Sequence, residues 1–281
     1  MTHKIKIVTD STADLPQEFI EKYEITVVPL YVNFPTKTYL DGVDIQPNEF
    51  YPLLEKAGDN LPKTSTPTIN DFLQTYESLL KEGYEILSIH ISSGLSSTAA
   101  MAEKAASMLN GKIHVFDSKS ISLGIGLQIL TALEMIKKNL SLDTIWEKLH
   151  ETRRRTEVFF SLDTLHYLEK GGRIGKVSAL LGTILKIKPV VRVVDGSYVP
   201  LDKARNQNQA IVKMAENMIK ILGEKIPEHI GVAHGAAEDA AKNLIKLVEE
   251  KYGRKIDLFA ETGPVIGVHT GPGTIGIAFI Y

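Results

Sequence analysis

The chain has 281 residues, 43% of them hydrophobic and 23% charged, which are the proportions of a globular protein with room for two domains. A formal net charge of −2 gives no electrostatic basis for binding nucleic acid, and the one basic run, residues 153–155, follows a helix predicted at residues 142–152. The absence of cysteine excludes disulfides, thiolate metal ligands and a cysteine nucleophile.

Neither end of the sequence has the pattern of a targeting or membrane segment. Residues 1–9 begin as a strand would, without the apolar stretch of a signal peptide. Residues 262–281 carry no formal charge, but five glycines, two prolines and a histidine in that window argue against a membrane-spanning helix. We therefore expect a cytoplasmic protein.

The first half of the chain alternates strands with helices. Apolar, β-branched runs predict strands at residues 5–9, 25–32, 85–91 and 113–116. Helices are predicted at residues 16–23, 47–57, 69–81, 99–109 and 121–137, with a hairpin-like excursion at 34–45 and a hydroxyl-rich loop at 63–68. Repeated strand–loop–helix units predict a mostly parallel sheet with helices on both faces.

Polar residues follow three of these strands, after Thr9, after Ile91 and after Phe116. In open α/β sheets, ligands bind outside the carboxyl ends of the strands. The sequence therefore predicts a polar crevice at that edge of the sheet.

The second half of the chain mixes hairpins and helices. Strands are predicted at residues 156–161, 188–194, 197–201, 230–234 and 256–261, and helices at 164–169, 207–222 and 236–252. Asp163 would cap the first of these helices, and Asp195-Gly196 suits a type I′ hairpin turn. We predict two α/β domains: residues 1–160, with the mostly parallel sheet, and residues 161–281, with a mixed α/β structure.

A glycine-rich segment, residues 263–274, surrounds His269 with glycines and prolines. Alternating Gly and Pro predicts a defined loop, because proline fixes φ while glycine allows sharp turns. Taken alone, this is a bend carrying one histidine. The histidines of the chain have no metal-ligand spacing, so we expect no metal site.

Two hydroxyl clusters, residues 64–68 and 92–98, each precede a predicted helix. Hydroxyls there can cap the helix, but these clusters hold more of them than two caps require. Uncharged donors beside helix N-termini can also hold a carboxylate or phosphate. Arg173 follows Gly171-Gly172 and is either an oxyanion ligand or a solvated arginine beyond a helix end.

Nucleotide and hydrolase motifs are absent from their usual places. No Walker loop or Gly-x-Gly-x-x-Gly follows the first strand, which argues against ATP or NAD binding. The nucleophile elbow Gly-x-Ser-x-Gly is also missing. A serine-dependent lipid esterase, using Ser96 or Ser93 with His269, stays open as the alternative function.

Four motifs occur along the chain in a fixed order: Lys63-Thr64-Ser65 with Pro67, Ser92-Ser93-Gly94-Leu95-Ser96, Asp163-Thr164-Leu165 with Gly171-Gly172-Arg173-Ile174, and His269-Thr270-Gly271-Pro272-Gly273-Thr274. In this order and spacing they resemble the DegV family of bacterial fatty-acid-binding proteins, over essentially the whole chain.

The resemblance implies two α/β domains with a long-chain fatty acid buried between them. It implies a non-catalytic carrier without a cofactor, similar to the lipid-carrying subunit of fatty acid kinase, which presents the acyl carboxyl to a separate ATP-binding kinase subunit. By the same resemblance, Thr64 and Ser96 would hydrogen-bond the carboxyl. Residues supporting the head group would be Ser65, Ser93, Arg173, His269 and Thr270. Transient contact with a membrane surface is compatible with this role.

Two residues depart from the family pattern: Thr66 stands where many relatives have glutamine, and Ser97 where many have glycine. Burying about fifteen methylenes at ~0.8 kcal/mol each would contribute on the order of 12 kcal/mol before association costs. The apolar segments 121–136 and 177–185 would either line the acyl tunnel or form ordinary core.

Overall fold

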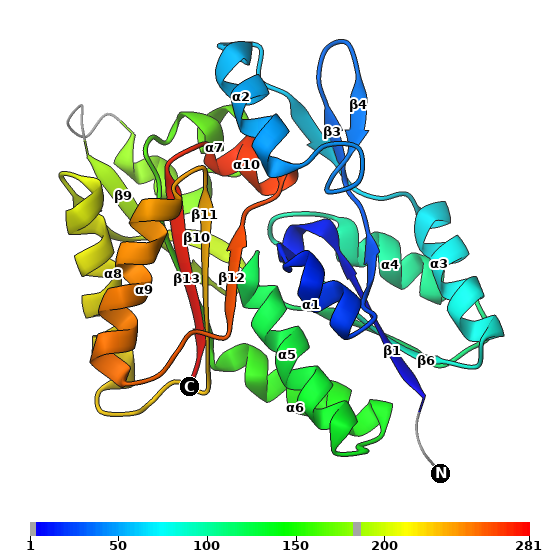
Figure 1. Cartoon of the computed structure of the whole chain (residues 1–281). Helices are drawn as coiled ribbons and strands as arrows, with labels where there is room; N and C mark the ends of the chain where they lie inside the picture. Colours follow the sequence, from blue (N-terminus) through cyan, green and yellow to red (C-terminus); the bar gives the residue numbers. More distant parts are fainter. Residues whose placement is uncertain (1–3, 182–186) are drawn as a thin grey trace.

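The computed structural model describes residues 4–181 and 187–281, and it stacks two β-sheets between layers of helices (Figure 1). From one side to the other, the layers are a helix pair, a parallel sheet, a central helix group, a mixed sheet and a second helix pair. A smaller three-stranded sheet lies over one end of the stack.

The N-terminal sheet is parallel in every pairing, with strand order β2-β1-β6-β7. Its strands are β1 (Ile5–Asp10), β2 (Thr26–Val28), β6 (Glu85–His90) and β7 (Ile113–Asp117). Its helices are α1 (Gln17–Lys22), α3 (Ile69–Lys81), α4 (Thr98–Ala106), α5 (Leu123–Lys137) and α6 (Leu142–Arg154). Ile86 packs with α3 and α4, while its neighbour Leu87 packs with α5 and α6. Alternate residues of a strand face opposite sides of a sheet, so both faces are covered, as predicted.

The C-terminal sheet is mixed, with strand order β10-β9-β8-β13-β11-β12. Only β11 and β12 pair in parallel among these strands. Its elements are β8 (Thr156–Ser161), β9 (Lys188–Val194), β10 (Ser197–Ala204), β11 (His229–Gly235), β12 (Leu258–Glu261), β13 (Thr274–Ile280), α8 (Gln207–Leu222) and α9 (Glu238–Tyr252). β8 spans the boundary predicted at residue 160, and that boundary stays a prediction.

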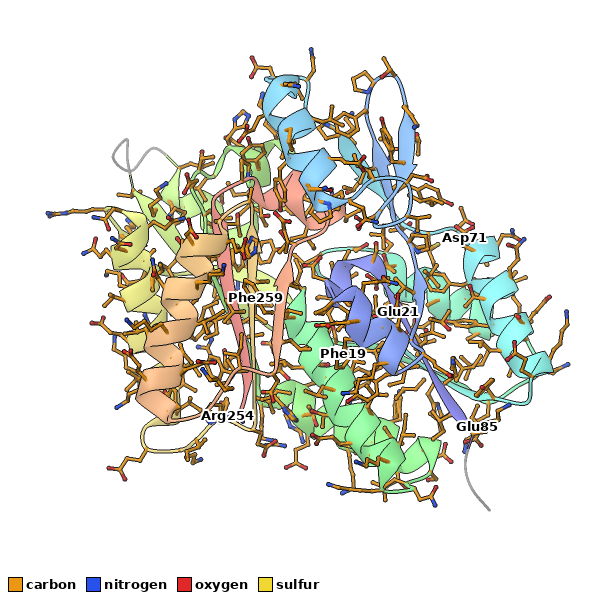
Figure 2. All side chains as sticks on the ribbon, viewed as in Figure 1. Phe19, Glu21, Asp71, Glu85, Arg254 and Phe259 are labelled. Atoms are coloured by element: carbon orange, nitrogen blue, oxygen red, sulfur yellow. The ribbon has the colours of Figure 1, made fainter. Side chains whose placement is uncertain are left out.

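Two side chains show how the sheets are covered. Phe259 of β12 packs into the cluster formed with α8 and α9, and Phe19 of α1 packs into the central layer (Figure 2). At the far end of α9, Arg254 donates to both carboxylate oxygens of Asp257 at 2.9 and 2.8 Å, which fixes the turn into β12.

Helix α5 lies between the two sheets and contributes to the packing of both. Its residues Leu123, Ile125, Leu127 and Ile129 are all at most 2% exposed and share one apolar cluster with strands of both sheets. Fully burying such a side chain contributes about 1.5–3 kcal/mol. Residues 121–136 were expected either to line the acyl tunnel or to form core. Most of α5 forms core.

The small sheet has strand order β4-β3-β5 and contradicts one prediction. Its strands are β3 (Tyr31–Asn33), β4 (Thr38–Leu40) and β5 (Lys63–Ser65), all antiparallel, and it packs against α2 (Pro47–Ala57). The prediction of a loop over residues 63–68 was wrong for Lys63–Ser65, because β3 offers backbone partners that a sequence pattern does not reveal. The hairpin-like excursion predicted at residues 34–45 contains β4, but its partner strand β3 begins earlier. The single strand predicted at residues 25–32 was wrong, because it is divided into β2 and β3, which belong to different sheets.

The glycine-rich segment contains a helix, α10 (Pro264–Thr270), where a loop was predicted. Pro264 occupies the first helical turn, which suits its fixed φ. Gly267 is needed for packing rather than turning, since a Cβ there would lie 2.5 Å from Phe50. The turns come afterwards, at Gly271 and Gly273, with φ of 73° and 83°.

Two further local predictions can be compared with the structure. Asp195 and Gly196 both have positive φ, 48° and 78°, which confirms the type I′ turn. The prediction of Asp163 as a helix cap was wrong, because its carboxylate pairs with Lys188 at 2.5 Å and Thr164 accepts from the His166 N–H. The short helix there is α7 (His166–Lys170), followed by the 3₁₀ helix η2 (Gly175–Leu180). Residues 182–185 of the predicted tunnel segment lie outside the described residues.

Candidate functional site

One small cavity, of about 30 Å³, joins four of the predicted site residues. Thr64 comes from β5, Ser96 from the loop before α4, Arg173 from the chain after α7, and His269 from α10. We call this the head-group cavity. Its lining is Thr12, Leu30, Thr64, Ile91, Leu95, Ser96, Ile121, Arg173, Tyr198, Val265, Ile266 and His269.

His269 has a strongly lowered pKa in the head-group cavity. Its Nε2 lies 2.8 Å from Thr64 Oγ1, and its Nδ1 is buried without a hydrogen-bond partner. Burial and, second, the charge of Arg173 lower the pKa of His269 to about 4. The imidazole is therefore neutral at pH 7, with one N–H donor and one acceptor. Thr64 occupies Nε2, so Nδ1 is the ring nitrogen left without a partner.

Gly171 makes room for this imidazole. A Cβ at residue 171 would overlap His269 Nδ1, although the helical φ of Gly171, −76°, would suit an alanine. The next residues turn back, and Arg173 Nη1 donates to the Gly171 carbonyl at 2.8 Å. The Gly171-Gly172-Arg173 motif thus fixes a guanidinium and a neutral histidine side by side.

Ser96 supports both interpretations of the hydroxyl cluster. Its Oγ lies 2.8 Å from Thr98 Oγ1 and accepts from the Thr98 N–H at 3.3 Å, at the start of α4. It also lines the head-group cavity, beside the N-terminus of that helix. The two family departures, Thr66 and Ser97, do not line this cavity.

Three predicted site residues lie outside the head-group cavity. Ser65 is exposed because it points to the opposite side of β5 from Thr64, and it accepts from Asn33. Ser93 is also exposed and accepts from Lys119 Nζ at 2.7 Å. Thr270 is buried and donates to the Ile266 carbonyl at 3.0 Å. Its side chain lines a second, apolar cavity.

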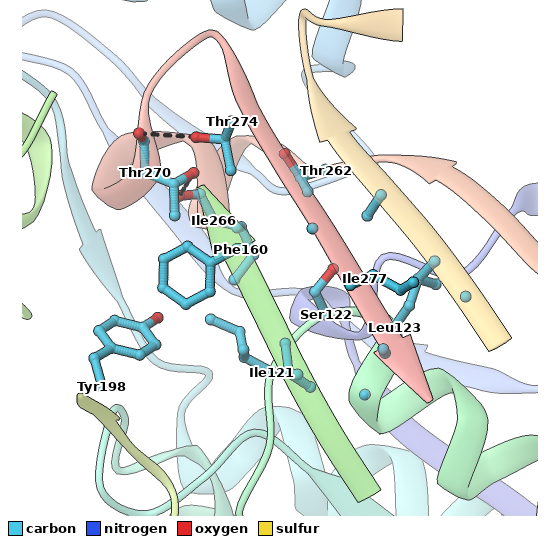
Figure 3. A pocket seen from close by; sticks show the side chains of 16 residues that line it. Ile121, Ser122, Leu123, Phe160, Tyr198, Thr262, Ile266, Thr270, Thr274 and Ile277 are labelled. Carbon is cyan, nitrogen blue, oxygen red and sulfur yellow. Dashed lines mark hydrogen bonds between the residues drawn. The ribbon is translucent and has the colours of Figure 1, made fainter. Parts of the chain in front are cut away.

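This apolar cavity has a volume of about 40 Å³ (Figure 3). We call it the tail cavity. The two cavities share three lining residues, Ile121, Tyr198 and Ile266. The rest of its lining is Ser122, Leu123, Gly124, Val158, Phe160, Gly231, Ala233, Thr262, Thr270, Thr274, Gly276, Ile277 and Ala278.

Tyr198 and Thr12 are lining residues that the sequence did not predict. Tyr198 is 2% exposed and borders both cavities. Its ring packs edge-on against that of Phe160, with the ring centroids 5.1 Å apart. Burial raises its pKa, so its hydroxyl stays protonated. Thr12 lies in the polar stretch after β1, where the sequence predicted a polar crevice at the carboxyl ends of the strands.

The hairpin of β9 and β10 reaches across to the serine loop and closes one side of the site. Ser92 Oγ donates to the Gly196 carbonyl at 2.9 Å. Gly94 permits this approach, since a Cβ at residue 94 would lie 2.6 Å from the same carbonyl oxygen. The Ser92–Gly94 stretch thus holds a contact between the two halves of the chain.

Neither proposed serine nucleophile is paired with His269. Its Nε2 is paired with Thr64, Ser96 is paired with Thr98, and Ser93 with Lys119. Asp10, His90 and Ser88 are linked in the order of a catalytic triad: His90 Nδ1 lies 2.9 Å from Asp10 Oδ2, and His90 Nε2 lies 2.7 Å from Ser88 Oγ. All three side chains are 0% exposed. The serine and the histidine are therefore closed to a substrate.

Within residues 4–181 and 187–281, no group of three or more His, Cys, Asp and Glu forms a metal cluster. In the same part of the chain, no helix combines the length and apolar character that crossing a membrane requires.

A protein-family model described as "Uncharacterised protein, DegV family" matches residues 4–281. The chain belongs to the DegV family. A DegV domain-containing protein of Staphylococcus aureus strain COL is 39% identical over 280 residues, covering 100% of this chain and 99% of that protein. Protein DegV of Bacillus subtilis strain 168 is 34% identical, with 99% of each chain covered.

Solved structures of DegV proteins have the same fold. A Thermus thermophilus DegV-family protein, described as binding fatty acid, has a TM-score of 0.90 at 36% identity, covering 99% of this chain and 100% of that one. A stearic acid-binding protein of Eubacterium ventriosum has a TM-score of 0.92 at 31% identity, covering 98% of both chains. The predicted two-domain α/β fold and the DegV resemblance are both confirmed.

Proposed function

We propose that this DegV-family chain binds a long-chain fatty acid, with the carboxyl in the head-group cavity and the alkyl chain in the tail cavity. One observation carries the proposal: the cavity that holds Thr64, Ser96, Arg173 and His269 shares Ile121, Tyr198 and Ile266 with an apolar cavity. A fatty acid has the same two parts, joined end to end. The relatives described as fatty-acid-binding proteins support the same conclusion.

The chemistry of the head-group cavity suits a carboxylate. Thr64, Ser96 and neutral His269 supply hydrogen-bond donors, and Arg173 supplies a positive charge. A buried carboxylate left unpaired would be strongly disfavoured, so such donors are required wherever one is held. Ser65 and Ser93 do not contribute to carboxylate binding in this proposal, and Thr270 belongs to the tail cavity.

The alkyl chain requires the tail cavity to expand. At about 10–15 Å³ for each water molecule, the present cavity has room for about three waters. Most of its lining is aliphatic or glycine, so side-chain shifts can enlarge it without exposing polar groups to the chain. Each methylene buried then contributes ~0.8 kcal/mol.

The finer part of the proposal concerns the fate of the bound fatty acid. The chain would act in the cytoplasm as a carrier that presents the acyl carboxyl to a separate kinase subunit, with transient contact at a membrane surface during loading. Arg173 next to neutral His269 would then accommodate the added negative charge of an acyl phosphate.

Native mass spectrometry of the purified chain, before and after incubation with oleate, tests the binding step. We expect one fatty acid per chain. Failure to retain oleate or palmitate would refute the proposal. Incubation with p-nitrophenyl palmitate tests the esterase alternative: the carrier should release no nitrophenol, and hydrolysis that Ser96→Ala abolishes would favour the esterase. With oleate and ATP but no second protein, no acyl phosphate should form.

A further inference from the structure

A third cavity, of about 280 Å³, lies beside the carboxyl end of β1 and is separate from the two lipid cavities. Four carboxylates line it, from Asp10, Asp14, Asp41 and Glu261, and none of its described lining residues is Lys, Arg or His. We call it the acidic cavity. The rest of its lining is Thr9, Ser11, Ala13, Leu15, Gln17, Ile20, Val27, Pro29, Gly42, Val43, Gln46, Pro47, Gly263 and Pro264.

Two of these carboxylates are buried with oxygens that have no hydrogen-bond partner. Asp41 is 3% exposed, and both of its side-chain oxygens are unpaired. Asp14 is 7% exposed; its Oδ1 accepts from the Gly263 N–H at 2.8 Å, while its Oδ2 is unpaired. The Ser11 hydroxyl and the Val265 N–H point towards Asp41, and the Ser122 hydroxyl towards Asp14; each lowers the pKa of its carboxyl, but none lies within hydrogen-bond geometry of an unpaired oxygen.

The two carboxylates converge on one point of the backbone. A Cβ built on Gly263 would lie 3.2 Å from Asp41 Oδ1 and 3.3 Å from Asp14 Oδ1. Burial raises the pKa of Asp41 to about 7 and that of Asp14 well above its ordinary value. The charge of Asp10 raises both further, and the charge of Asp41 also raises the pKa of Asp14. Asp10 differs, because its oxygens accept from Thr12, His90 and the Ile91 N–H.

We propose that the acidic cavity binds a small aliphatic amine, whose primary ammonium group bridges Asp14 and Asp41. An ammonium has three N–H donors, and the two carboxylates together hold three oxygens without a hydrogen-bond partner. These oxygens are enclosed, so the two side chains must rotate towards the cavity to meet the ammonium. Its charge would offset the burial of two carboxylates that no basic residue of the lining compensates.

Other occupants fit the cavity less well. A metal ion bound by protein side chains needs more ligands than this pair, and the described residues hold no cluster of three such groups. A cavity of about 280 Å³ also exceeds what one ion fills, but it holds a short alkyl chain. Glu261, only partly buried in the same lining, would meet a second ammonium.

The amine can enter from solvent. Gln17, Gly42, Val43 and Gln46 are exposed residues of the lining and form its mouth, whereas Asp14 and Asp41 lie at the buried end. This arrangement selects a ligand with an ammonium at one end of a slim chain.

Titration calorimetry of the whole chain with 1,4-diaminobutane tests the proposal, with 1,4-butanediol as the uncharged analogue of similar length. We expect binding of the diamine and none of the diol. Asp41→Asn keeps the shape of the side chain and should weaken diamine binding at least tenfold. Glu18→Gln, which removes an exposed carboxylate from α1 next to the lining residue Gln17, should bind as the unmodified chain does.

Circular dichroism establishes that each variant is folded before titration. Absence of diamine binding to the unmodified chain at millimolar concentration would overturn the proposal, whatever the variants do. Equal affinity of the unmodified chain and Asp41→Asn would also overturn it, as would binding of MgCl₂ at this site without binding of the diamine.

Discussion

Acidification should destabilise the fold through His269. The folded chain holds the pKa of this imidazole at about 4, against an ordinary value of 6.5, because the ring is buried beside Arg173. The unfolded chain therefore binds a proton between these two pH values that the folded chain lacks. The contribution of His269 to stability is complete above pH 6.5 and is lost as the pH falls towards 4.

The size of the effect follows from the shift. One pKa unit corresponds to 1.36 kcal/mol, so a shift of about 2.5 units gives a loss of about 3 kcal/mol at pH 4. At pH 5.0 the loss would be about 2 kcal/mol relative to neutral pH. Asp14 and Asp41, whose pKa values are raised, act in the opposite direction, so the contribution of His269 must be isolated with a variant.

Urea denaturation followed by circular dichroism at pH 7.5 and 5.0 measures the free energy of unfolding. Between pH 7.5 and 5.0, the free energy of unfolding should fall by about 2 kcal/mol more in the unmodified chain than in His269→Gln, because glutamine binds no proton in this range. Asp14 and Asp41 contribute equally to both proteins, so they cancel in the difference. An identical fall in the two proteins would refute the burial and charge argument for His269.

Three further predictions concern the lipid cavities. Thr64→Val should weaken oleate binding roughly 5- to 150-fold in a fluorescence displacement assay, because it removes a hydroxyl whose loss costs about 1–3 kcal/mol at a buried partner. Gly171→Ala should lower the free energy of unfolding in urea by about 1–3 kcal/mol, because its Cβ would overlap His269 Nδ1. Gly276→Ala should keep or slightly raise stability, since its Cβ would lie 3.5 Å or more from its neighbours, yet reduce binding of stearate relative to decanoate by narrowing the tail cavity.

Each of these predictions has a control within the chain. Ser65→Ala changes the exposed neighbour of Thr64 and should bind oleate normally; equal losses in both variants would contradict the assignment of Thr64 to the head-group cavity. Adding His269→Ala to Gly171→Ala should recover most of the lost stability, and strictly additive losses would exclude the proposed overlap. If Gly276→Ala weakened the binding of stearate and decanoate equally, the acyl chain would have to lie outside the tail cavity.

The sequence predicted the elements whose signals are local. The parallel sheet follows from apolar strands ending in polar residues, and the hairpin turn follows from Asp195-Gly196, where both residues need positive φ. The meeting of Thr64, Ser96, Arg173 and His269 was predicted through the family resemblance rather than from their spacing along the chain. Their binding roles remain predictions.

The features that were missed depend on tertiary contacts. Helix α10 has a glycine content that predicts a loop, but Gly267 serves the close approach of Phe50. Ser65 was grouped with Thr64 because both are hydroxyls, yet strand pairing with β3 sends it to the other side. Tyr198 carries no local signal at all, since only the packing of β10 against Phe160 places it beside the lipid cavities.

Helix α5, buried between the two sheets, limits how the molecule can open to admit a ligand. A hinge motion that separated the sheets would strip Leu123 and Ile125 of apolar neighbours on one side. At roughly 1.5–3 kcal/mol for each side chain so exposed, such a motion is costly. Ligand entry must therefore proceed by local rearrangement around the cavities. For the same reason the two halves should unfold together in a single cooperative transition, and neither half should fold when expressed alone.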